Sequence, residues 1–159
     1  MNDAKLVGIA QFAVARAPER LCCLGLGSCV AIFLHDPIAK IGGVAHILLP
    51  KAPKGHNSPD AKYADIGIRR LLDKVVAEGA DRKRLCAKLI GGAQMFSDLD
   101  LELSDIGKEN VLQSRKTLKE LGVPIVAEQV EGNRGISAYY SMEDGAVTIR
   151  TAFSNDRKI

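Results

Sequence analysis

Four short apolar runs fill the first 49 residues of this 159-residue chain, and turn residues separate them. Their composition and alternation predict strands over residues 6–15, 21–26, 30–34 and 41–49. Asp36-Pro37 lies between the third and fourth runs, and a residue that precedes proline is disfavoured in the helical region. Strands this close together in sequence favour hairpin pairing, so we expect antiparallel sheet in this part of the chain.

Two later stretches show apolar residues at helical spacing. The first predicted helix follows the polar loop 51–60, where Ser58 or Asp60 is expected to cap its N-terminus. The second runs from near Ser104 to Leu121, and Gly122-Pro124 follows as a stop signal. The apolar face of the first predicted helix comprises Ala64, Ile68, Leu71, Leu72, Val75 and Val76.

Further strands are predicted over residues 85–90, 125–130, 136–142 and 146–151, the last two forming a hairpin around Asp144-Gly145. Strands and helices therefore do not alternate regularly, as they would in a doubly wound sheet. We predict an α+β fold: one compact domain over residues 1–159, with mostly antiparallel or mixed layered sheets flanked by two main helices. The polar tail, residues 153–159, is expected to fray.

Composition argues against several classes of function. The net charge of +3 is spread along the chain, tryptophan is absent and aromatic residues make up 4%, so we expect no nucleic-acid partner. The longest apolar run, Leu21 to Leu34, is shorter than the roughly 20 residues that span a bilayer. The N-terminus lacks a signal-peptide pattern. We therefore expect a cytoplasmic protein without membrane insertion, whose four cysteines are reduced.

Cys29 follows Gly25-Leu26-Gly27-Ser28 in the middle of an apolar run. Two glycines weaken a simple core strand, so they indicate a bend that leaves backbone N–H groups free. An exposed thiol beside free N–H groups is what a cysteine nucleophile requires. A cysteine in an apolar run is also commonly a small core residue, and this alternative stays open.

His46 is the one polar residue in the apolar run from Val44 to Leu49. If the third and fourth predicted strands pair across the Asp36-Pro37 turn, His46 returns to the end of the hairpin where Cys29 lies. This geometry permits a Cys–His contact, although a buried histidine satisfied by its neighbours fits the pattern as well. His35 and His56 are expected to be solvated in a turn and a loop.

A metal site is the rival interpretation of the cysteines. Zinc sites favour cysteine pairs separated by two to four residues, whereas Cys22 and Cys23 are adjacent and Cys29 is distant. The glycine-rich segments also lack the Lys-Ser/Thr pair of a phosphate-binding loop. We therefore predict that the protein holds no metal and needs no cofactor.

Several segments, in order and at plausible spacing, closely resemble the chemoreceptor glutamine deamidase family, CheD. The resemblance spans nearly the whole chain. Its segments are Leu24-Gly25-Leu26-Gly27-Ser28-Cys29-Val30, Asp36-Pro37, Gly43-Val44-Ala45-His46-Ile47-Leu48-Leu49-Pro50, Lys62-Tyr63-Ala64-Asp65, Gly91-Gly92-Ala93-Gln94-Met95-Phe96, Ile106-Gly107 with Asn110, and Gly132-Asn133-Arg134.

The resemblance implies a layered fold related to bacterial toxin deamidases. It also implies hydrolysis of selected glutamine side chains on methyl-accepting chemotaxis proteins, giving glutamate and ammonia. The family's nucleophile and base fall on Cys29 and His46. Its third catalytic residue, a threonine six positions before the nucleophile, is replaced here by Cys23. A thiol accepts hydrogen bonds more weakly than a hydroxyl, so another group, such as a backbone carbonyl, would have to orient the base.

The expected chemistry is attack of the Cys29 thiolate on the glutamine carboxamide, followed by hydrolysis of a thioester. Backbone N–H groups around Gly27 and Ser28 are the candidate oxyanion donors. From the sequence alone, Met95 and Phe96 fit equally well as a docking surface or as loop residues that fold back onto the core. By the resemblance, they are expected to dock the helical cytoplasmic domain of a receptor and a CheC-type phosphatase.

Two other functions remain open. Cys23 at the threonine position favours a weakly catalytic module that regulates the phosphatase. A thioesterase or methylesterase would use the same Cys–His pair.

Overall fold

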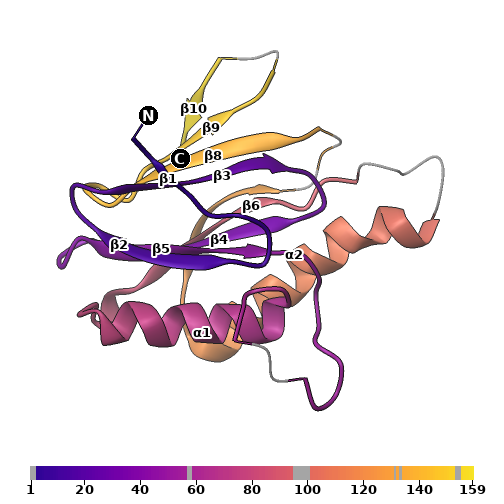
Figure 1. Ribbon diagram of the computed structural model, residues 1–159, viewed down its shortest axis with the longest axis horizontal. Coiled ribbons are helices and arrows are strands. Elements are labelled where there is room, and N and C mark those ends of the chain that lie inside the picture. Colours follow the sequence, from indigo (N-terminus) through magenta and orange to yellow (C-terminus); the bar gives the residue numbers. More distant parts are fainter. Residues whose placement is uncertain (1–2, 57–58, 95–100, 131, 133, 153–154) are drawn as a thin grey trace.

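The computed structural model describes residues 3–56, 59–94, 101–130, 132, 134–152 and 155–159, with backbone alone over 101–104. Two five-stranded sheets face each other, and helices α1 and α2 lie together on the far side of one of them (Figure 1). The predicted α+β class with two main helices is confirmed. No helix in the described part of the chain is both long and apolar enough to cross a membrane.

The first sheet, here called the β3 sheet, has the strand order β1-β3-β8-β9-β10. All its neighbouring strands are antiparallel except β1 and β3. The backbone of Ile159 exchanges two hydrogen bonds with Val147, so the expectation that the tail frays is wrong for residues 157–159. The strands are β1 (Lys5–Leu6), β3 (Arg20–Leu26), β8 (Ile136–Ser141), β9 (Val147–Arg150) and β10 (Arg157–Lys158).

The second sheet, the β4 sheet, has the order β2-β5-β4-β6-β7 and one parallel pair, β6 with β7. Its β4–β5 pair forms the hairpin predicted across Asp36-Pro37. Helix α1 lies against β2, β5 and β4, and α2 against β4, β6 and β7. The elements are β2 (Phe12–Arg16), β4 (Val30–Asp36), β5 (Ile41–Ile47), α1 (Ala64–Ala77), the short η1 (Arg82–Arg84), β6 (Cys86–Gly91), α2 (Leu101–Leu121) and β7 (Ile125–Val130).

Two N-terminal predictions are wrong in detail. The single strand expected over residues 6–15 is two strands in different sheets, because the chain between them crosses from the β3 sheet to the β4 sheet. Helix α1 begins after Tyr63 without a side-chain cap, since Leu49 and Tyr63 first form a β-bridge. Asp60 instead accepts a hydrogen bond from the Lys62 N–H, and Ser58 lies outside the described residues.

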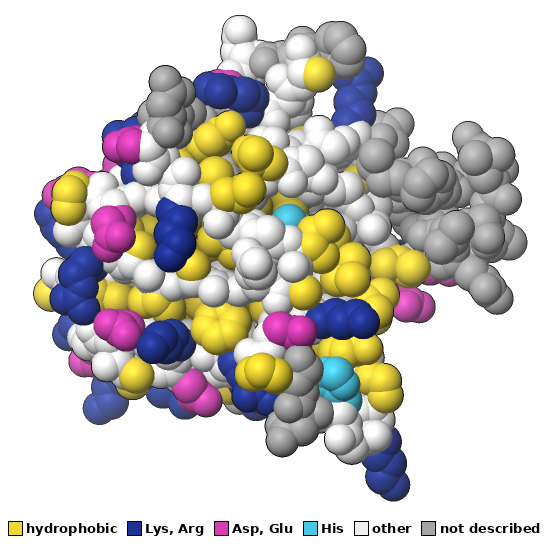
Figure 2. Space-filling view, in the orientation of Figure 1, with side chains coloured by type: hydrophobic (Ala, Val, Ile, Leu, Met, Phe, Trp, Pro, Cys, Tyr) yellow, Lys and Arg dark blue, Asp and Glu magenta, His cyan; other side chains and the backbone are white. Residues whose placement is uncertain are grey.

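Strand β4 is covered on both faces, which explains its almost uninterrupted apolar sequence. Ile32 and Leu34 pack toward the helices, whereas Ala31 and Phe33 pack into the layer between the sheets. This alternation assigns a face to every residue of the central strands. On the surface, Lys and Arg side chains are scattered over the face shown in Figure 2 and form no single basic stripe there.

Candidate active site

The register of the β4–β5 hairpin assigns Cys29 and His46 to neighbouring positions at one end of the two strands. Ala31 lies directly opposite His46, and Cys29 precedes Ala31 by two residues. Cys29 and Ala31 both belong to the inter-sheet layer, as does Val44, two residues before His46. The imidazole and the thiol are therefore assigned to the same face, in diagonal positions whose Cα atoms are typically about 7–8 Å apart.

The His46 ring is held by the N-terminal segment. Its Nδ1 lies 3.1 Å from the carbonyl oxygen of Val7. Because a carbonyl can only accept, Nδ1 carries the proton in the neutral ring and Nε2 keeps a free lone pair. Backbone hydrogen bonds from Ala10 N–H to His46 O and from His46 N–H to Gln11 O, both 2.9 Å, fix the strand beside it. The sequence contains no signal for this choice of carbonyl.

Burial sets the protonation states of the pair. The exposed thiol that the glycines around Cys29 led us to expect is not found, because Cys29 packs in the layer between the sheets and is only 8% exposed. His46 is 3% exposed. Burial raises the pKa of the Cys29 thiol above its ordinary 9.0, although the backbone N–H of Cys29 opposes the rise. Burial also lowers the pKa of His46 below its ordinary 6.5, against the effect of the Val7 hydrogen bond. At neutral pH the resting pair is therefore a neutral thiol and a neutral imidazole.

Among the described residues, no hydrogen bond joins the Cys29 thiol to the imidazole, whose Nδ1 is occupied by Val7. Hydrogen bonds between a nucleophile and its base commonly shorten only when substrate binds. The arrangement suits a reaction in which the proton moves from sulfur to Nε2 during the attack.

Cys23 lies in the same inter-sheet layer and is fully buried. Burial, followed by the neighbouring Cys22 and Cys29, raises its pKa to about 12, so it remains a protonated thiol at neutral pH. Within the described part of the chain, the Nδ1 of His46 is bonded to Val7 and not to Cys23. The structure thus places Cys23 near the pair but gives it no role in orienting the base.

The loop that carries the nucleophile turns all three of its carbonyl groups away from the site. Gly27 O accepts from Ala93 N–H at 2.8 Å, and Cys29 O accepts from Gly92 N–H at 2.9 Å. Ser28 O accepts from the side-chain amide of Asn110 at 2.9 Å. In the described part of the chain, the N–H groups of Gly27 and Ser28 donate to no other residue. They remain the predicted oxyanion donors.

Glycines let β6 and α2 approach this loop. A Cβ at Gly91, whose φ is +112°, would collide with the carbonyl oxygen of Cys29. A Cβ at Gly107 would collide with the backbone of Gly92 and Ala93. The close approach explains two glycine positions whose purpose the sequence pattern could not reveal.

Other predicted positions lie elsewhere. Met95 and Phe96, the expected docking residues, are outside the described part of the chain. His35 is not solvated: it is 6% exposed within β4, and its Nδ1 lies 2.9 Å from the Tyr140 hydroxyl. His56 is half-buried, with its ring centroid 4.8 Å from that of Tyr63. Among the described side chains, no three His, Cys, Asp or Glu residues gather in a way that could hold a metal ion.

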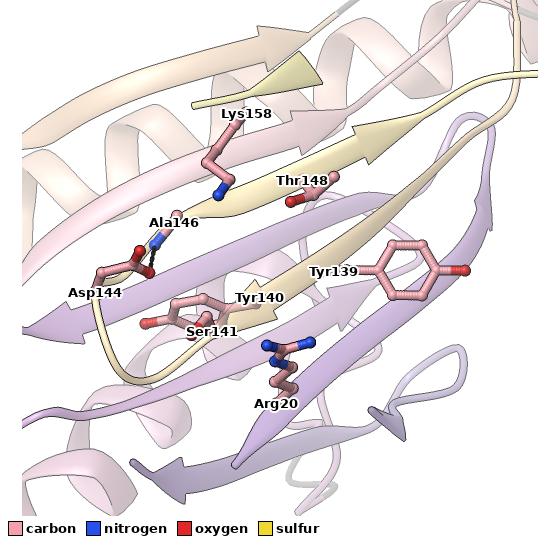
Figure 3. Close-up of a pocket in the computed structure, with 8 residues that line it drawn as sticks. All are labelled: Arg20, Tyr139, Tyr140, Ser141, Asp144, Ala146, Thr148 and Lys158. Atoms are coloured by element: carbon pink, nitrogen blue, oxygen red, sulfur yellow. Dashed lines mark hydrogen bonds between the residues drawn. The ribbon is translucent and has the colours of Figure 1, made fainter. Parts of the chain in front are cut away.

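A separate pocket of about 160 Å³ opens on the β3 sheet and contains neither Cys29 nor His46. Figure 3 shows Arg20 and Lys158 reaching toward it from different strands, while the Asp144 carboxylate accepts the Ala146 N–H at its edge. Its lining comprises Arg20, Tyr139, Tyr140, Ser141, Asp144, Ala146, Thr148 and Lys158. This pocket is therefore distinct from the Cys–His pair.

Comparison with known proteins decides the family. The family model described as CheD chemotactic sensory transduction matches residues 48–151. A "Probable chemoreceptor glutamine deamidase CheD" from Caldanaerobacter subterraneus subsp. tengcongensis is 46% identical over 147 residues, 91% of each chain. The chain belongs to the CheD family.

Other CheD relatives agree with this assignment. A second "Probable chemoreceptor glutamine deamidase CheD", from Moorella thermoacetica, is 48% identical over 148 residues, 91% of this chain and 89% of the relative. The "Chemoreceptor glutamine deamidase CheD" of Halalkalibacterium halodurans is 41% identical over 162 aligned positions, covering both chains completely.

Among solved structures, the crystal structure of Bacillus licheniformis hypothetical protein YfiH gives a TM-score of 0.47 at 17% identity, over 74% of this chain and 49% of that one.

Proposed function

We propose that this CheD-family chain is a protein-glutamine deamidase of the cytoplasm. It hydrolyses selected glutamine side chains on the helical cytoplasmic domain of chemotaxis receptors to glutamate and ammonia. The observation that supports the proposal is the pairing of His46 with Ala31, two residues after Cys29, together with the hydrogen bond that holds the His46 Nδ1 on the Val7 carbonyl. The relatives are named chemoreceptor glutamine deamidase, and this name supplies the proposed substrate class.

The acylation step follows from these positions. His46 Nε2 takes the thiol proton of Cys29 as the sulfur bonds to the carboxamide carbon of the substrate. The carbonyl oxygen becomes an oxyanion, which the N–H groups of Gly27 and Ser28 stabilise. The imidazolium then gives its proton to the amide nitrogen, the carbon–nitrogen bond breaks, and ammonia leaves a thioester on Cys29.

Deacylation uses the same groups in reverse. His46 takes a proton from water, whose oxygen bonds to the thioester carbon. The carbon–sulfur bond then breaks, the glutamate carboxyl leaves, and the proton on His46 returns to the Cys29 sulfur. Each step moves one proton between atoms already in the site or the substrate, so no metal or organic cofactor takes part.

A second candidate function rests on Cys23. This thiol occupies the position of the family threonine, which would favour a weakly catalytic module that binds a CheC-type phosphatase. Docking of either partner is assigned to Met95 and Phe96 as a prediction. The Val7 carbonyl supports the enzyme instead, because it supplies the fixed tautomer that a catalytic threonine would otherwise help to set.

The direct test is to incubate the protein with a receptor cytoplasmic fragment and map the products by mass spectrometry. The proposal expects particular glutamines to become glutamates, with an equal amount of ammonia released. Binding of the phosphatase without any conversion of a competent receptor would identify the regulatory module. Conversion of receptor methyl esters, with glutamines left intact, would identify the methylesterase.

A further inference from the structure

We propose that Asn110, on α2, is a positioning residue that ties the nucleophile loop to the histidine strand. The inference rests on the proposed function, because it assigns a role in the geometry of the same Cys29–His46 pair. Asn110 does not reach the reacting atoms. It acts through the two backbone segments that present the thiol and the imidazole.

The two hydrogen bonds of Asn110 join these segments directly. Its side-chain Nδ2 donates to Ser28 O at 2.9 Å and to Leu48 O at 3.0 Å. Ser28 immediately precedes the nucleophile, and Leu48 lies two residues after His46. One amide group therefore contacts both halves of the candidate active site.

The position of these bonds shows why they matter. The β4–β5 ladder ends at the pair Val30–Ile47, so Cys29 and Leu48 lie just beyond its last described pair. The N–H of Leu48 donates to Lys62 rather than to β4. Past the end of the described ladder, β4 and β5 no longer exchange hydrogen bonds, and Asn110 links the two backbone segments instead. The relative placement of Cys29 and His46 therefore depends on α2.

The cost of this arrangement indicates that it serves more than stability. Asn110 is fully buried, and within the described part of the chain its Oδ1 has no hydrogen-bond partner. Leaving a buried acceptor unsatisfied is destabilising, so the two hydrogen bonds to Ser28 O and Leu48 O are kept at the expense of the Asn110 oxygen. The side chain thus donates both amide hydrogen bonds to the active-site loops, while its oxygen accepts none from the described residues.

Helix α2 also provides a matched control. Ser114 lies about one turn beyond Asn110, is fully buried, and has a side-chain oxygen without a described partner. Ser114 donates no described hydrogen bond to Ser28 or Leu48, whose carbonyls are taken by Asn110. Ser114→Ala therefore removes a buried unsatisfied polar group from the same helix without touching the active-site loops.

The experiment compares Asn110→Leu with Ser114→Ala on a receptor cytoplasmic fragment. We expect Asn110→Leu to lower kcat by about 100-fold, since small misplacements of reacting groups cost this much. KM should change by less than about threefold, because the substrate-binding surface is not altered. Ser114→Ala should keep the wild-type kcat. An unchanged kcat in Asn110→Leu would overturn the proposal.

A second measurement separates positioning from general destabilisation and needs no receptor. Amide hydrogen exchange is followed at Gly92 and Ala93, whose N–H groups hold Cys29 O and Gly27 O. We expect exchange there to rise by at least about tenfold in Asn110→Leu, with strands β8 and β9 unchanged. Faster exchange throughout both sheets, with a kcat loss matching the unfolded fraction, would show a merely structural role and overturn the proposal.

Asn110→Ser, which keeps one donor but cannot reach both carbonyls, replaces Asn110→Leu if the leucine variant does not fold. The same criteria apply to it. If wild-type protein releases no ammonia, the proposed function fails, and local exchange at Gly92 and Ala93 still decides whether Asn110 holds the loop.

Discussion

His46 Nδ1 and the Val7 carbonyl oxygen lie 3.1 Å apart, and this hydrogen bond joins the two sheets at the candidate active site. Val7 follows β1 of the β3 sheet, and His46 is in β5 of the β4 sheet. A backbone carbonyl is an orienting group that mutation of a side chain cannot remove. It makes the tautomer of His46 independent of whether residue 23 is a threonine or a cysteine.

The pH dependence of deamidation should report the His46 base. Burial lowers the pKa of His46 below 6.5, and the neutral ring is the active form. Activity should therefore be lost only as pH falls below 6.5, through the lowered pKa, and should be constant from there to neutral pH. The measurement is kcat/KM for a receptor fragment against pH. An acidic limb centred above 6.5 would mean that an anion, such as a preformed Cys29 thiolate, faces the ring.

Replacing Cys23 should do little harm. Its thiol is fully buried, stays protonated, and does not orient His46. We expect Cys23→Thr to leave kcat for ammonia release equal to wild type or higher, because a hydroxyl is the stronger acceptor and the two side chains are similar in size. A loss of more than about tenfold, in protein whose melting temperature is unchanged, would show that Cys23 has a catalytic role of its own.

Gly91→Ala should damage the nucleophile loop. Its Cβ would collide with the Cys29 carbonyl, which the Gly92 N–H now holds. We expect kcat to fall at least tenfold as the loop shifts. Gly122→Ala is the matched control, because Gly122 also has positive φ (+73°) but has nothing within 4 Å of its Cβ position. An equal loss of activity in the two variants would show that backbone strain alone, and not the collision, sets the effect, and wild-type activity in both would contradict the prediction.

Asp36 should dominate the acid stability of the fold. Its fully buried carboxylate accepts two hydrogen bonds from Arg84 at 2.9 Å and one from the Asp81 N–H at 2.8 Å. These hydrogen bonds hold the pKa of Asp36 well below its ordinary 3.8, and those from Arg84 have the largest effect. The stabilisation is therefore present above about pH 4 and is lost as pH falls through the lowered pKa.

Asp36→Ala should lower the free energy of unfolding at pH 7 by about 3 kcal/mol, because it leaves Arg84 and a buried turn without their acceptor. Urea unfolding measures this change. Asp156→Ala, which breaks the exposed Arg150–Asp156 pair, should cost less than about 1 kcal/mol. Equal effects of the two substitutions would contradict the assignment of Asp36 as a structural centre.

The sequence predicted those parts of the fold that local patterns specify. Uninterrupted apolar runs and the Asp36-Pro37 turn gave β4, β5 and their pairing, because hairpin register depends on neighbouring residues. The sequence did not predict that residues 6–15 divide into β1 and β2. This segment passes from one sheet to the other, so its apolar residues occur at both odd and even positions and do not show where one strand ends. The short β10 was missed because its pairing comes from a distant strand and not from its polar sequence.

The candidate site was predictable only in part. Cys29 and His46 stand out by their residue types within apolar runs, and strand parity is enough to place them on one face. The groups that hold them do not stand out. Every residue has a backbone carbonyl, so the sequence does not mark that of Val7 as the partner of His46. Asn110 lies 64 positions after His46, and only the three-dimensional fold brings it to the pair.

The most direct test of the central claim is ammonia release from a receptor cytoplasmic fragment by Cys29→Ala, with Cys22→Ala as the matched control. Cys22 is also a buried free thiol, but it belongs to β3 and lies outside the proposed pair. We predict that Cys29→Ala releases no ammonia while remaining folded, and that Cys22→Ala matches wild type. Wild-type ammonia release by Cys29→Ala would contradict the assignment of Cys29 as the nucleophile.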